Sequence, residues 1–388
     1  MRRIIITGLD IGTTSVRVAV CEITKGSRHP KVLALVKAES RGLRRGYVIN
    51  QDEVSQVIRA VIAEAGRQSQ TRIKHVILGL GGITLESRLG ESQIVVSRAD
   101  AEITNNDINR VIELAETSLP NMVNNRVIHT IPLYFKLDGH KIPGRPEGMR
   151  GTKLEVRVLF IVCLNQHHDN LLRAVESAGL SVNEIVATPI AAGLVALSTQ
   201  QKNVGCVLAN IGSQTTSLAV FEDGIPVSLQ VLPIGSMDIT NDIALGLRVP
   251  LDEAERLKLS GDQILPFRKK LDEIIEARLS DMFDLIEAHL KKIGRSGLLP
   301  AGVIITGGGG NIENIAGLAK DELRLPARVF TPVGENQGRP ALRDSHWIVA
   351  YGLCLFGLGG DPDNPSIQPS IFGPIKRKFL HWLKELWP

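Results

Sequence analysis

One segment of the chain recurs two hundred positions later, and this repeat restricts the fold more than any other feature. Residues 9–20 read LDIGTTSVRVAV and residues 209–220 read ANIGSQTTSLAV, so Gly212 lies 200 positions after Gly12 (212 − 12). Each copy has the pattern of a strand, a turn with glycine and a second strand. The alternative is a chance similarity between two Gly/Thr hairpins. If the repeat is real, it predicts a duplicated domain whose two turns face one cleft.

The composition is that of a folded protein with more than one domain. The chain has 388 residues, of which 43% are hydrophobic and 22% charged, so it can bury a substantial core. The aromatic content of 4% and the net charge of +4 argue against nucleic acid as a partner. The four cysteines, none in a CxxC pair, are expected to be reduced core residues.

Strand and helix patterns alternate along the chain, which predicts an α/β fold. Strands are predicted at 3–9, 16–23, 31–38, 75–80, 126–135, 153–162, 204–211 and 303–306. Helices are predicted at 52–67, 106–119, 266–293, 313–323 and 346–358. Residues 84–162 follow the order strand, helix, strand, strand, which indicates a small inserted α+β subdomain.

The first turn is a candidate phosphate site. Asp10 ends an apolar strand and is followed by Gly12, Thr13 and Thr14. Small residues in a tight turn allow main-chain amides and hydroxyl groups to approach phosphate oxygens, and the carboxylate can hold hydrated Mg²⁺ through water. The alternative is a turn with no ligand.

Two further segments could complete a nucleotide site. Gly307–Gly310 and Asn311 follow an apolar strand and precede a predicted helix, so their backbone could lie against adenine or phosphate. The alternative is a glycine-rich loop without a ligand; the pattern is not the GxGxxG of a dinucleotide fold. Glu255 and Lys258 share a helix face and could bind ribose hydroxyls, or could form a solvated ion pair.

The first hairpin (9–20) and the second hairpin (209–220) resemble the two phosphate loops of the actin, Hsp70 and hexokinase superfamily. The four-glycine turn (307–311) resembles its adenosine motif, and the three segments occur in the same order and at similar spacing. TPIAAGLVAL (188–197) and AYGLCLFG (350–357) resemble its two connecting helices. The FtsA family is the most similar, over nearly the whole chain. The segments that carry this resemblance are ESRGLRRGYVINQDEVSQVIRAVIAEA (39–65), RVIHTIPLYFKLDG (126–139), EGMRGTKLEVRV (147–158) and IIEARLSDMFDLIEAHL (274–290).

The resemblance implies an α/β, actin-like, two-lobed ATPase fold with duplicated subdomains, an FtsA-type inserted α+β subdomain and a C-terminal amphipathic helix. The expected domains are the first part of lobe 1 (1–83), the insertion (84–162), the second part of lobe 1 (163–200), lobe 2 (201–345), a closing helix of lobe 1 (346–358), a linker (359–370) and the terminal helix (371–388).

The resemblance also implies bound ATP and Mg²⁺, with Asp10 as the metal-binding residue. The implied nucleotide contacts are Asp10, Gly12, Thr13, Thr14, Asn210, Gly212, Ser213, Gln214, Thr215, Glu255, Lys258, Gly307, Gly308, Gly309, Gly310 and Asn311. The second loop departs from the usual Asp-x-Gly-Gly-Gly-Thr, because it reads Asn-Ile-Gly-Ser-Gln-Thr. Asn210 cannot act as a base and lacks a charge to support metal-bound water. We therefore expect retained or weakened nucleotide binding, with slow or absent hydrolysis.

The last thirteen-residue segment before Pro388, IKRKFLHWLKELW, predicts an amphipathic helix that lies in a membrane interface. The residues expected to contact the membrane are Ile375, Lys376, Arg377, Lys378, Phe379, Trp382, Leu383, Lys384, Leu386 and Trp387. Such a helix is roughly 20 Å long, too short for a core of about 30 Å. Residues 371–388 carry four cations and one anion, which favours anionic lipids. The alternative is a helix docked on its own fold or on a partner.

The family resemblance implies an adaptor on the cytoplasmic side of the inner membrane at the mid-cell division site. It would self-associate into filaments, hold the tubulin-like FtsZ at the membrane and recruit later divisome proteins. The alternatives are a type IV pilus scaffold of the PilM kind, an ATP-dependent small-molecule kinase and an MreB-like filament. Asn210 argues against the kinase, and the inserted subdomain argues against MreB.

Overall fold

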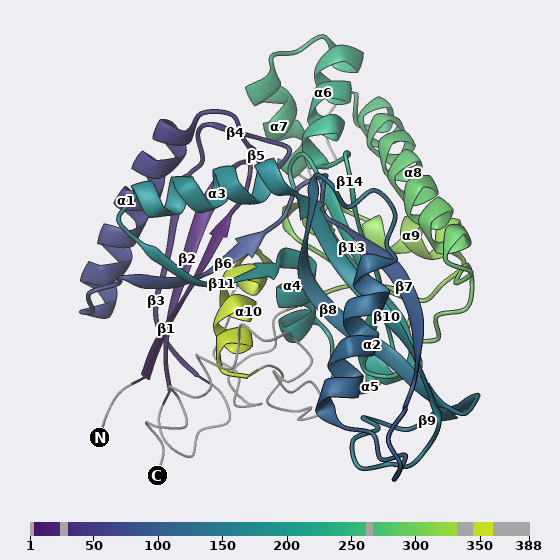
Figure 1. Cartoon of the computed structure of the whole chain (residues 1–388). Helices are drawn as coiled ribbons and strands as arrows, with labels where there is room; N and C mark the ends of the chain where they lie inside the picture. Colours follow the sequence, from purple (N-terminus) through teal and green to yellow (C-terminus); the bar gives the residue numbers. More distant parts are fainter. Residues whose placement is uncertain (1–3, 24–29, 261–266, 332–343, 360–388) are drawn as a thin grey trace.

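Two sheets with the same strand order form the two lobes. The computed structural model describes residues 4–23, 30–260, 267–331 and 344–359. The first sheet has the order β11-β6-β1-β2-β3 (Figure 1), and the second begins β16-β15-β12-β13-β14. In each lobe an antiparallel hairpin, β1–β2 or β12–β13, has a parallel strand beside it, β6 or β15. The predicted actin-like duplication of an α/β unit is confirmed.

The strand bounds follow from short apolar, β-branched runs between turn residues. The first sheet contains β1 (Ile4–Ile11), β2 (Ser15–Ile23), β3 (Lys31–Glu39), β6 (His75–Leu80) and β11 (Ser181–Ala187). The second lobe contains β12 (Cys206–Ile211), β13 (Thr216–Glu222), β14 (Ile225–Leu232), β15 (Val303–Thr306) and β16 (Ala327–Val329). A small hairpin, β4 (Leu43–Arg44) and β5 (Tyr47–Val48), stands apart from both sheets.

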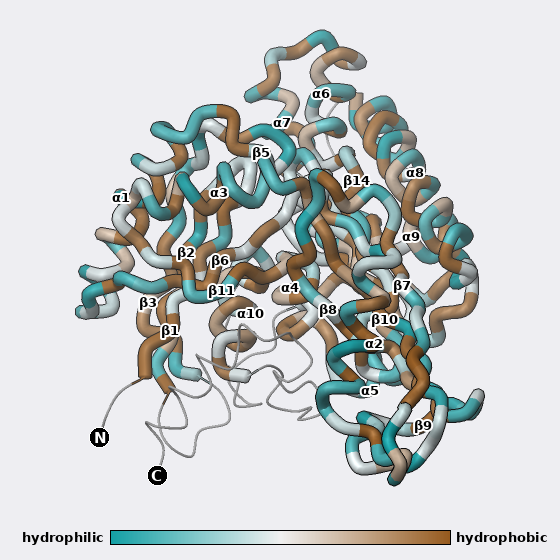
Figure 2. The backbone as a smooth tube through the Cα atoms, viewed as in Figure 1, coloured by the Kyte–Doolittle hydropathy of each residue, from teal (hydrophilic) through white to brown (hydrophobic). Residues whose placement is uncertain are grey.

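Helices cover both sheets and fill the space between them. Those of lobe 1 are α1 (Gln51–Ser69) and α3 (Asn165–Ser177), and those of lobe 2 are α6 (Ser236–Leu247), α7 (Leu251–Ser260), α8 (Arg268–Lys292) and α9 (Ile315–Leu323). They are amphipathic, and hydrophilic and hydrophobic colours alternate along α8 in Figure 2. The polar face of such a helix stays in solvent while its apolar stripe covers the sheet.

Two apolar helices, α4 (Thr188–Ala196) and α10 (Ile348–Gly357), lie between the sheets and contact each other. Every residue of both helices is buried. Helix α4 follows the first sheet but contacts β12 and β13, whereas α10 follows the second sheet but contacts β1 and β2. A helix that is apolar on all sides needs such a buried middle layer, and this exchange ties the two lobes together.

The segment that follows β6 adds its strands to the edge of the second sheet. Its strands β7 (Glu86–Val95), β8 (Asn125–Leu137), β9 (His140–Ile142) and β10 (Lys153–Leu164) extend the second sheet in the order β14-β7-β10-β8-β9, and α2 (Asn105–Thr117) packs on β7 and β10. The predicted order of strand, helix, strand, strand is confirmed, with β9 as an additional short strand.

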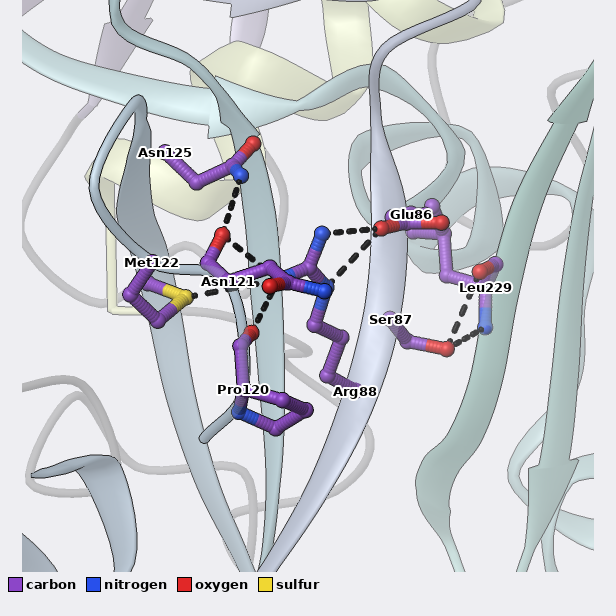
Figure 3. Close-up of polar contacts among 8 residues, drawn as sticks. All are labelled: Glu86, Ser87, Arg88, Pro120, Asn121, Met122, Asn125 and Leu229. Carbon is purple, nitrogen blue, oxygen red and sulfur yellow. Dashed lines mark hydrogen bonds and ion pairs between the residues drawn. The ribbon is translucent and has the colours of Figure 1, made fainter. Parts of the chain in front are cut away.

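The junction between β14 and β7 is narrow. One residue pair, Gln230 and Glu86, is in main-chain register. Beside it the Ser87 hydroxyl donates to the Leu229 carbonyl (3.0 Å) and accepts from the Leu229 amide (2.8 Å). Arg88 then ion-pairs with Glu86 (2.7 Å) and donates to the carbonyl oxygen of Pro120 (2.9 Å), as Figure 3 shows. Across the junction, the Ser87 hydroxyl therefore supplements the single main-chain pair, whereas Arg88 ties β7 to the loop before β8 within the inserted segment.

Several predicted elements differ from the structure in detail. A short helix, α5 (Thr199–Val204), occupies the start of the strand predicted at 204–211. Gly308, Gly309, Gly310 and Asn311 themselves form a 3₁₀ turn, η1 (Gly308–Asn311), and α9 begins at Ile315 rather than at residue 313. All four cysteines are buried and free, as predicted. The linker and terminal helix predicted for 359–388 lie, apart from Gly359, outside the described residues.

Candidate nucleotide-binding site

The first candidate group lies where β1 turns into β2. Asp10 stands opposite Arg17 in the antiparallel register, and the carboxylate lies 3.9 Å from the guanidinium. Both side chains are largely buried. Burial raises the pKa of the Asp10 carboxyl to about 6, while the nearby Arg17 charge acts in the opposite direction. A divalent cation would stabilise the carboxylate, so this buried acid fits a hydrated Mg²⁺.

The turn that follows leaves amide donors for an anion. Gly12 N–H donates to Ser15 O (3.1 Å) and closes the turn. The main-chain amides of Thr13 and Thr14 donate to no main-chain acceptor in the described part of the chain. Consecutive amides in such a turn can bind phosphate oxygens, so the structure keeps these two predicted residues available.

The second hairpin copies this geometry without its charges. Asn210 stands opposite Ser217, each 200 positions after Asp10 and Arg17. Gly212 N–H donates to Thr215 O (2.8 Å), which matches the bond that closes the first turn. The second site is therefore neutral where the first has an acid and a base.

The start of α6 holds the second turn from behind. Ser236 N–H donates to Gly212 O (2.9 Å) and Met237 N–H donates to Ser213 O (2.7 Å). The amides of Ser213 and Gln214, like their counterparts in the first turn, donate to no main-chain acceptor among the described residues. The first amides of α6 already donate to carbonyl oxygens of the turn, so they are not available to a phosphate. The amides of the turn itself are the donors that a phosphate could use.

The glycine-rich turn packs directly on the second hairpin. Gly307 has a φ of +85°, and a Cβ there would lie 2.5 Å from both the Asn210 Oδ1 atom and the Ile211 carbonyl oxygen. A Cβ on Gly309 would lie 2.4 Å from the Ile211 side chain. Two of the four glycines are thus required for close packing, whatever ligand the turn binds. Asn311 ends the 3₁₀ turn, and Gly310 N–H donates to Gly307 O (3.1 Å).

Glu255 and Lys258 form a network beneath the second turn. The Lys258 ammonium, only 4% exposed, donates to Glu255 Oε2 (2.7 Å), Thr240 Oγ1 (2.9 Å) and Ser236 O (3.2 Å). These contacts use its three protons, so the pair is not the solvated ion pair considered above. Burial raises the pKa of Glu255, but hydrogen bonds from Lys258 and Thr240 lower it overall. The Glu255 side chain is 42% exposed and remains the better candidate for a ribose contact.

A residue group that the sequence reasoning missed connects the glycine turn to the first hairpin. The 3₁₀ segment η3 (Ser345–Trp347) brings His346 Nε2 to 3.0 Å from a Cβ built on Gly308, and His346 also bonds to Asp344. Burial raises the pKa of Asp344, but hydrogen bonds with His346 and the charge of Arg17 lower it overall. The candidate residues of both hairpins and of the glycine turn therefore lie in one region.

Of the residues missed from the sequence, Arg17 had a recognisable signal. Arg17 sits seven residues after Asp10 in the first copy of the repeat and becomes Ser217 in the second. Across a hairpin with its turn at 12–14, this spacing places the arginine opposite the acid. Asp344 and His346 had no comparable signal, because they follow a segment with no recognisable pattern.

A family model described as "Cell division protein FtsA" matches residues 207–352, and a model described as "SHS2 domain inserted in FTSA" matches residues 85–162. The cell division protein FtsA of Pseudomonas aeruginosa is 30% identical, covering 94% of this chain and 92% of that protein. The FtsA of Bacillus subtilis is 32% identical, covering 90% of this chain and 82% of that protein.

Solved structures agree with this fold. The chain is similar to a structure titled "PilM-PilN type IV pilus biogenesis complex", with a TM-score of 0.66 and 20% identity over 93% of this chain and 99% of that one. It is also similar to MreB5 of Spiroplasma citri bound to ADP, with a TM-score of 0.51 and 14% identity over 92% of this chain and 96% of that one. At these identities the structural matches show the actin-like fold alone.

Proposed function

Because this chain belongs to the FtsA family of cell division proteins, we propose that it is an adaptor that binds ATP between its lobes and tethers FtsZ to the cytoplasmic membrane at mid-cell. The observation that carries the nucleotide part is the pair of equivalent turns, 12–15 and 212–215, each closed by the same main-chain bond. The PilM-like alternative shares the fold, but the sequence relatives at 30% identity or more are cell division proteins.

In this proposal the two turns hold the phosphates and Asp10 holds magnesium through water. The amides at positions 13, 14, 213 and 214 supply donors, and the Thr13 hydroxyl supplies another. Magnesium would neutralise phosphate charge and stabilise the Asp10 carboxylate. Asn210 is neutral and cannot accept a proton from water, so we expect slow or absent hydrolysis. Binding of ATP measured with and without Mg²⁺, beside phosphate release, tests this; phosphate release stimulated by a sugar or acetate would favour the kinase alternative.

Membrane attachment is assigned to residues 371–388, which lie outside the described residues. Among the helices that the structure describes, none combines the length and apolar character needed to cross a membrane. The support is the sequence pattern, with aromatic and aliphatic residues on one face and cations on the other.

Liposome co-sedimentation tests this assignment directly. The full chain and a version ending at Pro369 would be mixed with anionic vesicles, with and without ATP and Mg²⁺. We expect the full chain to pellet with the vesicles and the shortened chain to stay in solution. If both stay in solution, the terminal segment is a packing or partner element and the membrane part of the proposal fails.

Partner contacts are proposed from the family and from exposed apolar residues. The long helix α8 and its neighbours are the proposed FtsZ-facing side of lobe 2, where Leu245, Leu251 and Leu259 are 78%, 55% and 64% exposed. The subdomain at 84–162 is proposed to contact the next protomer of a filament and later divisome proteins. Copurification with FtsZ would support this assignment, and copurification with pilus components in its place would contradict it.

A further inference from the structure

The turn between β4 and β5 reaches from lobe 1 to both candidate phosphate turns. Its two central residues, Arg45 (φ +50°) and Gly46 (φ +81°), have the left-handed conformation typical of a tight two-residue hairpin turn. Gly46 N–H donates to Thr13 Oγ1 (3.3 Å). Arg45 N–H donates to Gln214 Oε1 (2.8 Å), which joins residues 169 positions apart. One short hairpin thus contacts the equivalent turns of both lobes.

The lobe 1 side of this bridge is held firmly. His167 Nε2 lies 3.0 Å from Gly46 O, and because a carbonyl can only accept, this nitrogen carries the hydrogen. Its Nδ1 atom therefore accepts from the Thr84 hydroxyl (2.7 Å). The Tyr47 ring stacks on the imidazole with centroids 4.5 Å apart. A Cβ on Gly46 would lie 2.5 Å from the Gly82 Cα atom, so the turn is seated against the end of β6. The Arg45 amide is therefore presented in a set direction.

The lobe 2 side is a side chain on an anchored turn. The bonds from Gly212 to Thr215 and from Met237 to Ser213 hold the main chain around Gln214. The Gln214 side chain is the adaptable part of the bridge, and its amide group has one acceptor oxygen and two N–H donors. While Oε1 accepts from Arg45, the Nε2 hydrogens can donate to a second group.

We propose that Gln214 is a positioning residue that couples the lobes to the nucleotide: its Oε1 atom accepts from Arg45 N–H, and its Nε2 group donates to a phosphate oxygen. The inference rests on the proposed nucleotide binding. The usual glycine of the second loop has no side chain to make this bridge, so the departure at Gln214 adds a contact where Asn210 removes a charge. The bridge holds the lobes together across the phosphates and slows release of the nucleotide.

Two measurements on the full chain test the proposal, with wild type, Gln214→Ala and a control, Gln230→Ala, which makes the same chemical change elsewhere in lobe 2. The first is millisecond hydrogen exchange of the peptide that covers residues 43–48, without nucleotide. We expect Gln214→Ala to speed exchange at Arg45 between about twofold and tenfold, as for the loss of one neutral hydrogen bond. Wild-type exchange in Gln214→Ala would overturn the bridge.

The second measurement is the release rate of a fluorescent ATP analogue with Mg²⁺, chased with unlabelled ATP. We expect Gln214→Ala to release it between about twofold and tenfold faster, with Gln230→Ala close to wild type. Equal release from wild type and Gln214→Ala would refute the coupling while leaving nucleotide binding intact. Failure of the wild type to bind the analogue would overturn the proposed nucleotide function and the coupling together, which separates the two failures.

Discussion

Substitution of Asp10 by asparagine should stabilise the nucleotide-free protein more at alkaline pH than at acidic pH. The folded-state pKa of Asp10 is raised from 3.8 to about 6, chiefly by burial. A carboxyl whose folded pKa is raised loses stability as pH rises, because ionisation is easier in the unfolded chain. The difference between the folded and unfolded pKa values of Asp10 lowers the free energy of unfolding by about 3 kcal/mol at pH 8, where the group is fully ionised. At pH 5 the loss is about half of that.

The assay is urea unfolding of wild type and Asp10→Asn at pH 5 and pH 8, without nucleotide or divalent cations. The free energy of unfolding of the variant minus that of the wild type should be about 1.5 kcal/mol larger at pH 8 than at pH 5. The attraction to Arg17 acts only where Asp10 is ionised, and it is already contained in the pKa of about 6, so it needs no separate correction. Asp107→Asn is the matched control: hydrogen bonds from Thr104 lower the pKa of Asp107, so the stability lost by this variant should be the same at both pH values.

A difference between wild type and Asp10→Asn that does not change with pH would refute the reasoning, because Asp10 would then titrate normally in the folded protein. With Mg²⁺ and ATP added at pH 8, the order should reverse. The wild type should gain stability from the bound ligand, and the variant, which lacks the carboxylate, should gain less. An equal gain in both would remove Asp10 from the proposed metal site.

Three further outcomes follow from other contacts. Burial lowers the pKa of His289 from 6.5 to about 4, so protonation is easier in the unfolded chain and the folded state loses stability as pH falls through this range. Between pH 8 and pH 5, the free energy of unfolding of the wild type should fall by about 2 kcal/mol more than that of His289→Gln in the same assay. Gly307→Ala should weaken ATP binding and lower the unfolding midpoint strongly, whereas Gly294→Ala, which also has a positive φ (+69°) but no atom within 4 Å of the added Cβ, should cost about 1 kcal/mol by calorimetry. Ser87→Ala should cost about 1–2 kcal/mol in urea unfolding by removing both bonds to Leu229, and an unchanged midpoint would contradict the role of this junction.

Local patterns were sufficient wherever neighbouring residues decide the structure. The strands predicted at 75–80 and 303–306 have those bounds in β6 and β15, because each is a short apolar run between turn residues. The repeat at Gly12 and Gly212 predicted the duplicated hairpins for the same reason. Helix α5 was missed although Ser198 and Gln201 form a capping box at its start, a signal that was present in the sequence.

The repeat and the amphipathic patterns determined the fold class and most elements, because these depend on spacing along the chain, and the family followed from the resemblance of particular segments to FtsA. Only the tertiary structure shows that the buried Lys258 ammonium donates to three acceptors. It also shows that α4 and α10 each contact the sheet of the other lobe, and that the Arg45 amide donates to Gln214. Each of these depends on side chains or main-chain groups that are far apart in the sequence, and on space that exists only after both sheets have packed. A pattern along the chain carries no information about such distances, so the candidate residues could be named from the sequence but not their partners.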